Sequence, residues 1–573
     1  MEKVQVIPVG GVEEIGINCT VIRYADKIIV IDVGLGFSDV DHLGVDYLIP
    51  NYDYLKNNKE KIEGIFITHG HLDHIGAVEY FLKELDYPDL FAPRFALELI
   101  KRRLEEAKIL DKAKLHAVDE RSSLKNGELT VEYFRVNHSI PDSYGVAVRT
   151  PVGTIVHTGD FKFDNSPLNE PVADYLKMAT LGAEGVKLLL SDSTNSGRSG
   201  HSISERTIMG ALSDVVKAAP GRVIVATFGS LITRLYALVE IAKITKRKIF
   251  ITGRSMHTAI EIARKLGYIN ATDDMFITPN NVKRFADSNL MVLSTGSQGE
   301  NMSALARMSR GEHRDLTLKK GDTVVLSSSI IPGNDSMVQI LIDELSRIGV
   351  KIINNDMTNL HTSGHGFIED QKLMLNLIKP ELFMPVHGYQ YFLGQHAETA
   401  IVTGVKRENT IIAKRGEIIE ISESGWKSAG RIKHEPLLVS GLGVGDIGPL
   451  LLQDREKLAA NGVLMVSLVV KGSHNKGREL YKDPSVYSRG FVFVKENMEL
   501  MRKITDKAKS VFAKYKDVED KFIPSLRQNL EKELSVLIYN LAKREPLILV
   551  NIEIIELPGG RKPKLLDAAA IEI

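Results

Sequence analysis

The chain has little cysteine, little tryptophan and no excess of charge of either sign. Its 573 residues include one cysteine, Cys19, and one tryptophan. A single cysteine excludes a disulfide framework and a cysteine-rich zinc site, so a metal ion must be held by histidine, aspartate or glutamate. Basic and acidic residues number 73 each. This balance argues against a surface coated with positive charge for nucleic acid.

Long apolar runs are also missing, and none approaches the ~20 residues that span a bilayer. Residues 1–8 have the pattern of a strand rather than the basic and then apolar pattern of a signal peptide. We therefore expect a cytoplasmic protein without a membrane association. The single cysteine agrees with a reducing compartment.

What is present is an alternation of short β-branched runs with longer helical patterns, which is typical of α/β architecture. Hydrophobic residues make up 43% of the chain and charged residues 25%, as in globular proteins, and the length predicts three or more domains. The predicted strands are 27–31, 64–68, 154–158, 187–191, 222–227, 248–252, 323–328 and 382–386, and the predicted helices include 76–84, 95–107 and 204–218.

Two stretches rich in glycine and serine, 191–201 and 439–449, indicate boundaries, and the second is too rich in glycine for a helix or a central strand. Beyond it we expect a helix that begins at 454, a strand at 463–470, helices at 495–516 and 526–544, and a strand at 547–555. These elements predict a small α/β domain with an accessory or dimerisation role.

The strongest chemical signal is the hexapeptide His-Gly-His-Leu-Asp-His at 69–74. It follows a predicted strand and precedes a predicted helix, which is where α/β sheets place their functional sites. Three histidines and an aspartate so close together would each need a polar partner if they were buried. Imidazole and carboxylate groups suit zinc or manganese. The hexapeptide therefore predicts a metal site.

Three later residues repeat the order of apolar strand, polar side chain and turn: His138, Asp160 and His387. Taken singly, such a residue is more often structural than a ligand. Because one turn cannot complete two metal sites, the three residues are candidate ligands that join the first cluster.

These motifs resemble those of the metallo-β-lactamase superfamily. Ser-Asp-Ser-Thr at 191–194, His-Thr-Ser-Gly-His at 361–365 and Pro-Val-His-Gly at 385–388 resemble its beta-CASP branch, which acts on nucleic acids. The segments 10–16, 43–50 and 487–492 resemble the ribonuclease J family. The likeness covers nearly the whole chain.

The resemblance implies a metallo-β-lactamase αββα sandwich with an inserted α/β beta-CASP domain and a small C-terminal α/β domain. The implied boundaries are 1–201 and 356–435 for the sandwich, 202–355 for the insertion, 436–449 for a linker and 450–573 for the C-terminal domain.

The resemblance further implies two zinc ions, with Mn²⁺ or Mg²⁺ as alternatives. The implied ligands are His69, His71, His138 and Asp160 for one ion, and Asp73, His74, His387 and the shared Asp160 for the other. The implied catalytic residues are Asp73 and His365. Asp32 and Asp192 would orient the ligands.

Substrate and calcium sites are implied in the same way. The implied substrate-binding residues are Ser230, His361, Thr362, Ser363, Gly364 and His365. A structural Ca²⁺ would be bound by backbone oxygens at His42 and Gly44 and by an acidic residue near Asp446.

The implied activity is hydrolysis of single-stranded RNA in RNA maturation and decay, including rRNA processing and mRNA decay. It combines 5′-to-3′ exonuclease action, which favours 5′-monophosphate ends, with endonuclease action. The implied partners are further copies of the chain, as a homodimer or homotetramer, and RNA-decay or ribosome-associated proteins.

Three alternatives stay open. The first is a beta-CASP hydrolase that acts on DNA or on pre-mRNA ends. The second is a catalytically weak partner subunit, although such a chain would be expected to lose metal ligands. The third is a small-molecule hydrolase, which the long segment between Asp160 and His387 disfavours.

Overall fold

The computed structural model describes residues 2–37, 44–331, 333–355, 357–441, 443–445, 447–472, 478–491, 497–517 and 522–555. The chain divides into two compact units. The larger comprises Met1–Phe37 and Tyr47–Leu437, and the smaller comprises Ser38–Asp46 and Leu438–Ile573.

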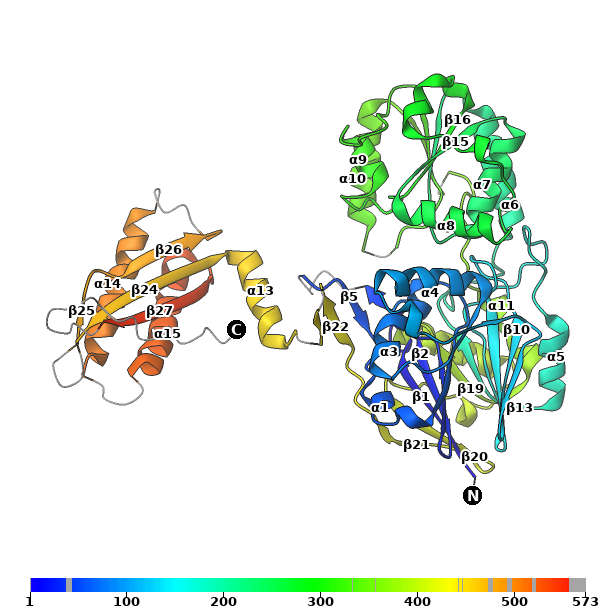
Figure 1. The fold of residues 1–573 in the computed structure, drawn as a ribbon, viewed down its shortest axis with the longest axis horizontal. Coiled ribbons are helices and arrows are strands. Elements are labelled where there is room, and N and C mark those ends of the chain that lie inside the picture. The colour runs from blue at the N-terminus through cyan, green and yellow to red at the C-terminus, as the bar shows by residue number, and fades with distance from the viewer. Residues whose placement is uncertain are drawn as a thin grey trace. The chain divides into compact units, whose positions relative to one another are not determined.

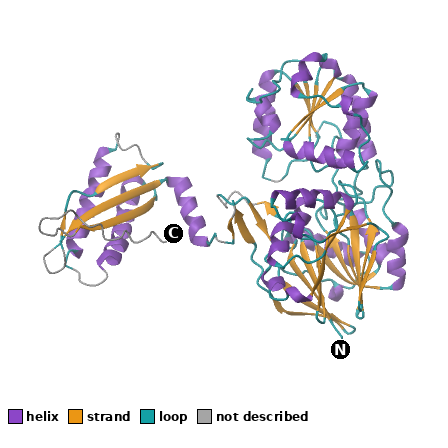
Figure 2. Ribbon diagram, viewed as in Figure 1, coloured by secondary structure: helices purple, strands orange, loops and turns teal. Residues whose placement is uncertain are grey.

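The larger unit is built on two mixed sheets that pack face to face (Figures 1 and 2). The eight-stranded sheet has the order β21 (Gly425–Arg431), β20 (Glu417–Ser422), β1 (Val4–Gly10), β2 (Cys19–Tyr24), β3 (Lys27–Ile31), β6 (Ile62–Phe66), β7 (Leu90–Pro93) and β8 (Leu115–Val118). The six-stranded sheet has the order β19 (Pro380–Val386), β13 (Val186–Asp192), β12 (Gly153–His157), β11 (Tyr144–Thr150), β10 (Leu129–Arg135) and β9 (Ser123–Asn126). Alternate side chains of both sheets, such as Ile22 and Leu190, form one buried core.

Helices lie on the outer faces of these sheets. α4 (Arg94–Glu106) lies against β7 and β8, beside α3 (Val78–Glu84). α5 (Tyr175–Glu184), α11 (Ile368–Ile378) and α12 (Gln390–Val402) share a buried cluster with the other sheet. The layers confirm the expected αββα sandwich.

The segment between β13 and β19 contains a separate five-stranded parallel sheet (Figure 1). Its order is β15 (Lys248–Thr252), β16 (Leu290–Ser294), β14 (Val223–Ala226), β17 (Thr323–Leu326) and β18 (Lys351–Ile353). Three helices pack on one face: α6 (Glu205–Ala218), α7 (Ile232–Ile244) and α8 (Arg254–Lys265). The helices α9 (Ala304–Ser309) and α10 (Asp335–Ile348) pack on the other face. This is the α/β insertion that the resemblance to the beta-CASP branch implies.

The smaller unit contains one sheet and two long helices. β24 (Val463–Lys471) pairs with β25 (Glu479–Leu480), β26 (Ser485–Arg489) and β27 (Leu547–Ile555). α14 (Met498–Tyr515) and α15 (Phe522–Ala542) bury the face that carries Leu464 and Val466. α13 (Pro449–Asn461) precedes β24. The expected C-terminal α/β domain is present, with β25 and β26 as strands that the apolar pattern did not predict.

Residues 439–449 were predicted to be too rich in glycine for a helix or a central strand, and the structure places two short strands in or beside this stretch. β22 (Leu437–Ser440) and β23 (Gly443–Val444) form a short antiparallel pair. Gly441 has a φ of +57°, a conformation that glycine adopts at little cost, so glycine here permits a turn between strands instead of preventing strands.

The remaining elements are short. They are β4 (Gly36–Phe37), β5 (Tyr47–Ile49), α1 (Asp53–Lys56), α2 (Leu72–Ile75), and the 3₁₀ helices η1 (Lys59–Lys61), η2 (Leu110–Lys112), η3 (Asp273–Met275), η4 (Pro279–Arg284), η5 (Asp287–Asn289) and η6 (Arg407–Asn409). Among the described residues, no helix has both the length and the apolar character needed to cross a bilayer.

Candidate metal centre

The candidate ligands lie where neighbouring parallel strands end. β12, β13 and β19 run parallel, and Asp160, Asp192 and His387 lie at or just beyond their C-terminal ends. β3 and β6 are also parallel, and Asp32 and His69 follow them. Because parallel strands end at the same edge of a sheet, residues far apart in the sequence meet there.

The first group of donors consists of three histidines and one aspartate: His69, His71, His138 and Asp160. His71 Nδ1 lies 3.1 Å from His69 Nε2 and 3.0 Å from His138 Nε2. Asp160 Oδ2 lies 3.6 Å from His69 Nε2 and 3.8 Å from His138 Nε2. These are the four residues expected at one metal ion.

The second group shares Asp160 and adds Asp73, His74 and His387. His74 Nε2 lies 3.2 Å from Asp160 Oδ2 and 3.6 Å from Asp73 Oδ2. His387 lies 3.0 Å from Asp160 Oδ1 through Nδ1 and 3.3 Å from Asp73 Oδ2 through Nε2. All seven predicted ligands are thus in two groups with one carboxylate in common.

A third group overlaps the second and contains Asp160, Asp192, His365 and His387. Asp192 Oδ2 accepts a hydrogen bond from His365 Nδ1 at 2.8 Å. The ring centroid of His365 lies 4.9 Å from that of His138 and 5.5 Å from that of His387. His365 therefore stands between the first two groups, held there by Asp192.

Hydrogen bonds to Nδ1 orient three of the rings. Asp32 Oδ2 accepts from His74 Nδ1 at 2.7 Å, and the carbonyl of Gly364 accepts from His138 Nδ1 at 2.7 Å. Thr68 Oγ1 donates to Asp32 Oδ2 and accepts from His69 Nδ1 at 3.0 Å. In a neutral ring, a proton on Nδ1 leaves the lone pair of Nε2 directed to the centre, as in His69 and His138.

Sequence reasoning missed several polar residues that support the centre. Asn18 Nδ2 lies 3.0 Å from His74 Nε2 and donates to the carbonyl of Asp73. Thr194 Oγ1 donates to Asp192 Oδ1 at 2.7 Å. Thr194 stands in a motif already noted at 191–194, so its spacing from Asp192 was an available signal. Asn18 carries no such signal.

Burial and mutual charge set the protonation of the centre. Burial lowers the pKa of His69 and His138 well below the usual value, and lowers that of His71 to about 4. Burial alone would also lower the pKa of His74 and His387, but Asp160 and the other carboxylates raise both well above the usual value. Three neutral imidazoles and clustered carboxylates therefore face one point.

This donor set fits metal ions. The lone pairs of His69 Nε2 and His138 Nε2 both point to His71 Nδ1, which can donate to only one of them. Converging lone pairs of neutral imidazoles, with a buried carboxylate beside them, repel one another unless a cation lies between them. Nitrogen and oxygen donors of this kind suit zinc and manganese.

The predicted substrate residues 361–365 lie against the first group. A Cβ atom on Gly364 would meet His138 Cε1 at 2.6 Å, so only glycine allows this approach. Thr362 Oγ1 donates to the carbonyl of Ile203 at 2.8 Å. Asn195 Nδ2 donates to Ser363 Oγ at 2.8 Å. His361 is half-buried, and its backbone N–H donates to Asn355 Oδ1 at 2.9 Å.

Two predicted sites are less well supported. Ser230 is exposed after β14, and the described residues give no hydrogen bond between its side chain and segment 361–365. Thr233, three residues on, donates to the carbonyl of Ser139 beside His138 at 3.2 Å. The calcium prediction involves His42 and Asp446, which lie outside the described residues.

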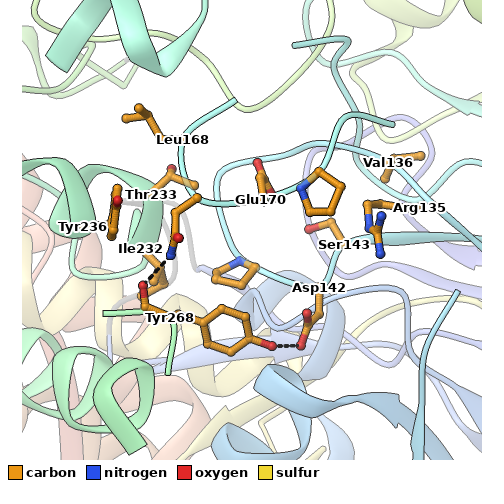
Figure 3. Close-up of a pocket in the computed structure, with 13 residues that line it drawn as sticks. Arg135, Val136, Asp142, Ser143, Leu168, Glu170, Ile232, Thr233, Tyr236 and Tyr268 are labelled. Atoms are coloured by element: carbon orange, nitrogen blue, oxygen red, sulfur yellow. Dashed lines mark hydrogen bonds between the residues drawn. The ribbon is translucent and has the colours of Figure 1, made fainter. Parts of the chain in front are cut away.

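A separate cavity of about 100 Å³ is lined in part by residues on either side of the loop 137–140 (Figure 3). Its lining includes Arg135, Asp142, Glu170 and Tyr268, and Tyr268 donates a hydrogen bond to Asp142. Burial raises the pKa of Glu170 to about 8, although Lys162 opposes this shift. None of the metal-centre residues lines the cavity.

Glu170 predicts a dependence of stability on pH. Its folded pKa is above its unfolded value, so its contribution to stability is complete below about pH 4.5 and is lost as the pH rises towards about 8. Glu170→Gln removes this loss. We expect the melting temperatures of variant and wild type to agree at pH 5 and the variant to melt higher at pH 8.5, measured by calorimetry. The exposed Glu423→Gln is the control, and an equal difference at both pH values would contradict the assignment.

Family models match three stretches of the chain. Residues 12–200 match the family model described as metallo-beta-lactamase superfamily, residues 220–345 match ribonuclease J, beta-CASP domain, and residues 450–555 match ribonuclease J C-terminal domain.

Curated relatives align over most of their own length. The chain is 39% identical over 550 residues to ribonuclease J 1 of Streptococcus pyogenes, covering 96% of this chain and 97% of the relative. It is 36% identical to ribonuclease J2 of Bacillus subtilis, covering 96% and 98%. It is 40% identical to ribonuclease J of Helicobacter pylori, covering 87% and 72%.

A solved structure supports the fold alone. A protein of unknown function from Enterococcus faecalis aligns with a TM-score of 0.50 at 15% identity, covering 74% of this chain and all of that chain.

Proposed function

The chain belongs to the ribonuclease J family and is a metal-dependent RNA hydrolase, and from this premise we propose that it removes nucleotides from the 5′ end of single-stranded RNA and also cuts internally. The observation that carries the proposal is the pair of buried donor groups that share Asp160, with the Asp192–His365 pair beside them. The substrate is RNA with a 5′-monophosphate.

The proposed metal ligands are the seven residues of the first two groups. Metal ions bound there supply Lewis acidity and acidify a water molecule. Asp73 is the proposed acceptor of the proton of the attacking water, because its side chain is 28% exposed whereas those of Asp160 and Asp192 are 3% and 2% exposed. The bond from phosphorus to the 3′ oxygen breaks, and the downstream product keeps the phosphate.

His365 is the proposed donor of a proton to the leaving 3′ oxygen. Burial alone would lower its pKa, but Asp192 and Asp160 raise it, which favours the protonated ring. Its side chain is 18% exposed, so substrate can reach it. Asp192 positions the ring and Asp32 positions His74, as second-sphere groups do in metal sites.

Segment His361–His365 is the proposed site for the 5′-phosphate. Ser363 Oγ already accepts from Asn195 Nδ2 at 2.8 Å and from the backbone N–H of His365 at 3.1 Å. Its hydroxyl proton is therefore directed elsewhere and can be donated to a phosphate oxygen. His361, Thr362, Gly364 and Ser230 complete the proposed pocket.

The donor set favours zinc and then manganese. We further propose a homodimer or homotetramer that assembles through the C-terminal domain. Metal analysis and sedimentation of the purified chain test these two statements.

The test of the proposed function is hydrolysis of single-stranded RNA labelled at its 5′ end, in the presence of Mn²⁺ or Zn²⁺. We expect labelled mononucleotide from the 5′-monophosphate form, at a rate about 10-fold or more above that from the triphosphate form, because segment His361–His365 is proposed to bind a single 5′-phosphate. A His71→Ala, Asp73→Ala double variant is the blank.

Other products would change the conclusion. Labelled fragments of several nucleotides without mononucleotide would show endonuclease action alone. RNA binding without cleavage under either metal would favour the partner-subunit alternative. Equal cleavage of the 2′-deoxy substrate would contradict a preference for RNA.

A further inference from the structure

Two tyrosines next to the second donor group are exposed. Tyr389 and Tyr391 follow His387 by two and four residues, and their side chains are 54% and 66% exposed. Tyr389 precedes the first residue of α12, and Tyr391 is the second residue of that helix. A tyrosine side chain combines an aromatic ring with a polar hydroxyl, which suits a surface that binds a partly polar ligand.

Phe392 holds the two rings against the loops of the centre. Its ring centroid lies 6.4 Å from that of Tyr389 and 5.6 Å from that of Tyr391. A Cβ atom on Gly388 would lie 3.3 Å from Phe392 Cβ, and one on Gly197 would lie 3.7 Å from Tyr391 Cε1. Phe392 therefore lies beside Gly388, which follows His387, and Tyr391 lies beside Gly197, in the loop that follows Asp192.

Other exposed groups border the same loops. Arg198 is exposed, and its guanidinium lies 5.7 Å from the centroid of Phe367. Ile15 is 38% exposed next to Glu14, which pairs with Gly388. Leu72 is 43% exposed between His71 and Asp73. Apolar surface with an adjacent cation is the combination that binds single-stranded nucleic acid, through stacking of bases and attraction of phosphates.

The position of the tyrosines selects one part of the substrate. In segment His361–His365, Gly364 contacts His138 of the first donor group and His365 stands between the two groups, whereas the tyrosines follow His387 of the second group. A strand whose 5′ nucleotide occupies the segment crosses both groups at the scissile phosphate. The nucleotides that follow the scissile bond then leave on the side of His387.

We propose that Tyr389 and Tyr391 form a tyrosine platform on which bases on the 3′ side of the scissile phosphate stack, with Arg198 against the backbone. The platform rests on the proposed function, since it binds the same substrate. It explains the exposure of both rings beside the centre, and it gives a sequence-tolerant grip because every base has an aromatic face.

The test compares a Tyr389→Ala, Tyr391→Ala double variant with the wild type on two substrates, a 5′-monophosphate RNA of 20 nucleotides and bis(p-nitrophenyl) phosphate, which has no downstream bases. We expect the ratio of kcat/KM for RNA to kcat/KM for the small diester to fall about tenfold or more, mainly through KM, given the usual contribution of stacking. Tyr389→Phe, Tyr391→Phe keeps the rings and restores the ratio.

A Tyr481→Ala, Tyr539→Ala variant is the matched control, because those tyrosines are 58% and 48% exposed in the smaller unit. It leaves the ratio unchanged. The length of the RNA is a second readout: KM of the wild type falls as nucleotides are added on the 3′ side, whereas KM of the platform variant does not.

Three results would overturn the platform. The first is an unchanged ratio of the two kcat/KM values. The second is an equal loss of kcat/KM on both substrates, which indicates a structural role. The third is altered sedimentation with an unchanged ratio, which indicates a contact between copies of the chain. Failure of the proposed function looks different, because the wild type then releases no mononucleotide from the RNA. In that case RNA binding by the His71→Ala, Asp73→Ala variant, with and without the tyrosine changes, still tests the platform.

Discussion

Asp160→Asn is expected to lower RNA hydrolysis by about 10³-fold or more, since the acidified water and the Lewis acidity both depend on the metal sites. Asp160 is the one residue common to all three donor groups. Its two oxygens face different partners, with Oδ1 3.0 Å from His387 Nδ1 and Oδ2 3.2 Å from His74 Nε2. An amide keeps the shape but replaces one oxygen by a nitrogen without a lone pair for a cation.

The measurement is kcat/KM on 5′-monophosphate RNA together with the metal content of the purified chain. Asp174→Asn is the matched control, because the Asp174 side chain caps α5 by accepting from the backbone N–H of Lys177 at 2.9 Å. Asparagine caps helices as well as aspartate does, so this variant should keep full activity. Activity of Asp160→Asn within tenfold of the wild type, with an unchanged metal content, would refute the shared ligand.

Arg234→Met is expected to lower the free energy of unfolding by about 3–5 kcal/mol, because it leaves a buried carboxylate without its partner. Arg234 in α7 is fully buried and forms two hydrogen bonds with Glu205 of α6, with Nε at 3.1 Å from Oε2 and Nη2 at 3.0 Å from Oε1. Arg234 Nη1 also donates to the carbonyl of Leu360 at 2.7 Å. Leu360 directly precedes segment His361–His365, so this variant should also weaken RNA cleavage.

Arg407→Met is the matched control for burial. Arg407 binds Glu398 through two bonds of 2.9 and 3.0 Å, but both side chains are more than half exposed. Solvent screens such a pair, so we expect little change. Calorimetry is the suitable measurement, because the only tryptophan, Trp426, lies outside the insertion. An Arg234→Met, Glu205→Gln variant should be more stable than the sum of the single changes predicts. Simple additivity would contradict a coupled pair.

The sequence alone was sufficient for the class of fold, and it predicted the seven side chains that the structure brings together in two donor groups. The donors of the hexapeptide at 69–74 follow one strand: His69, His71, Asp73 and His74. Their proximity is local and can therefore be seen directly in the sequence. His138, Asp160 and His387 each follow an apolar strand, and the ends of parallel strands meet at one edge of a sheet. The same apolar runs predict the α/β layers, although not the short strands β25 and β26.

Only the tertiary structure decided how these residues act on one another. The register of β13 on β19 pairs Asp192 with Val386, which lies 194 residues further along the chain. This register places Asp192 beside His387. No sequence motif predicts the hydrogen bonds by which Asn18, Thr68 and Asn195 support the centre. The sequence does not predict the pairing of Arg234 with Glu205 either.

The identities of the donors were therefore determined by the sequence, because each donor is a histidine or aspartate at the end of a strand. Their protonation, their ring orientation and the exposure of Tyr389 and Tyr391 were decided by the folded chain. Burial and long-range hydrogen bonds set these properties, and both depend on which strands pair and in which register. Apolar periodicity specifies the buried face of a strand, but it specifies neither the partner strand nor a shift of two residues along it.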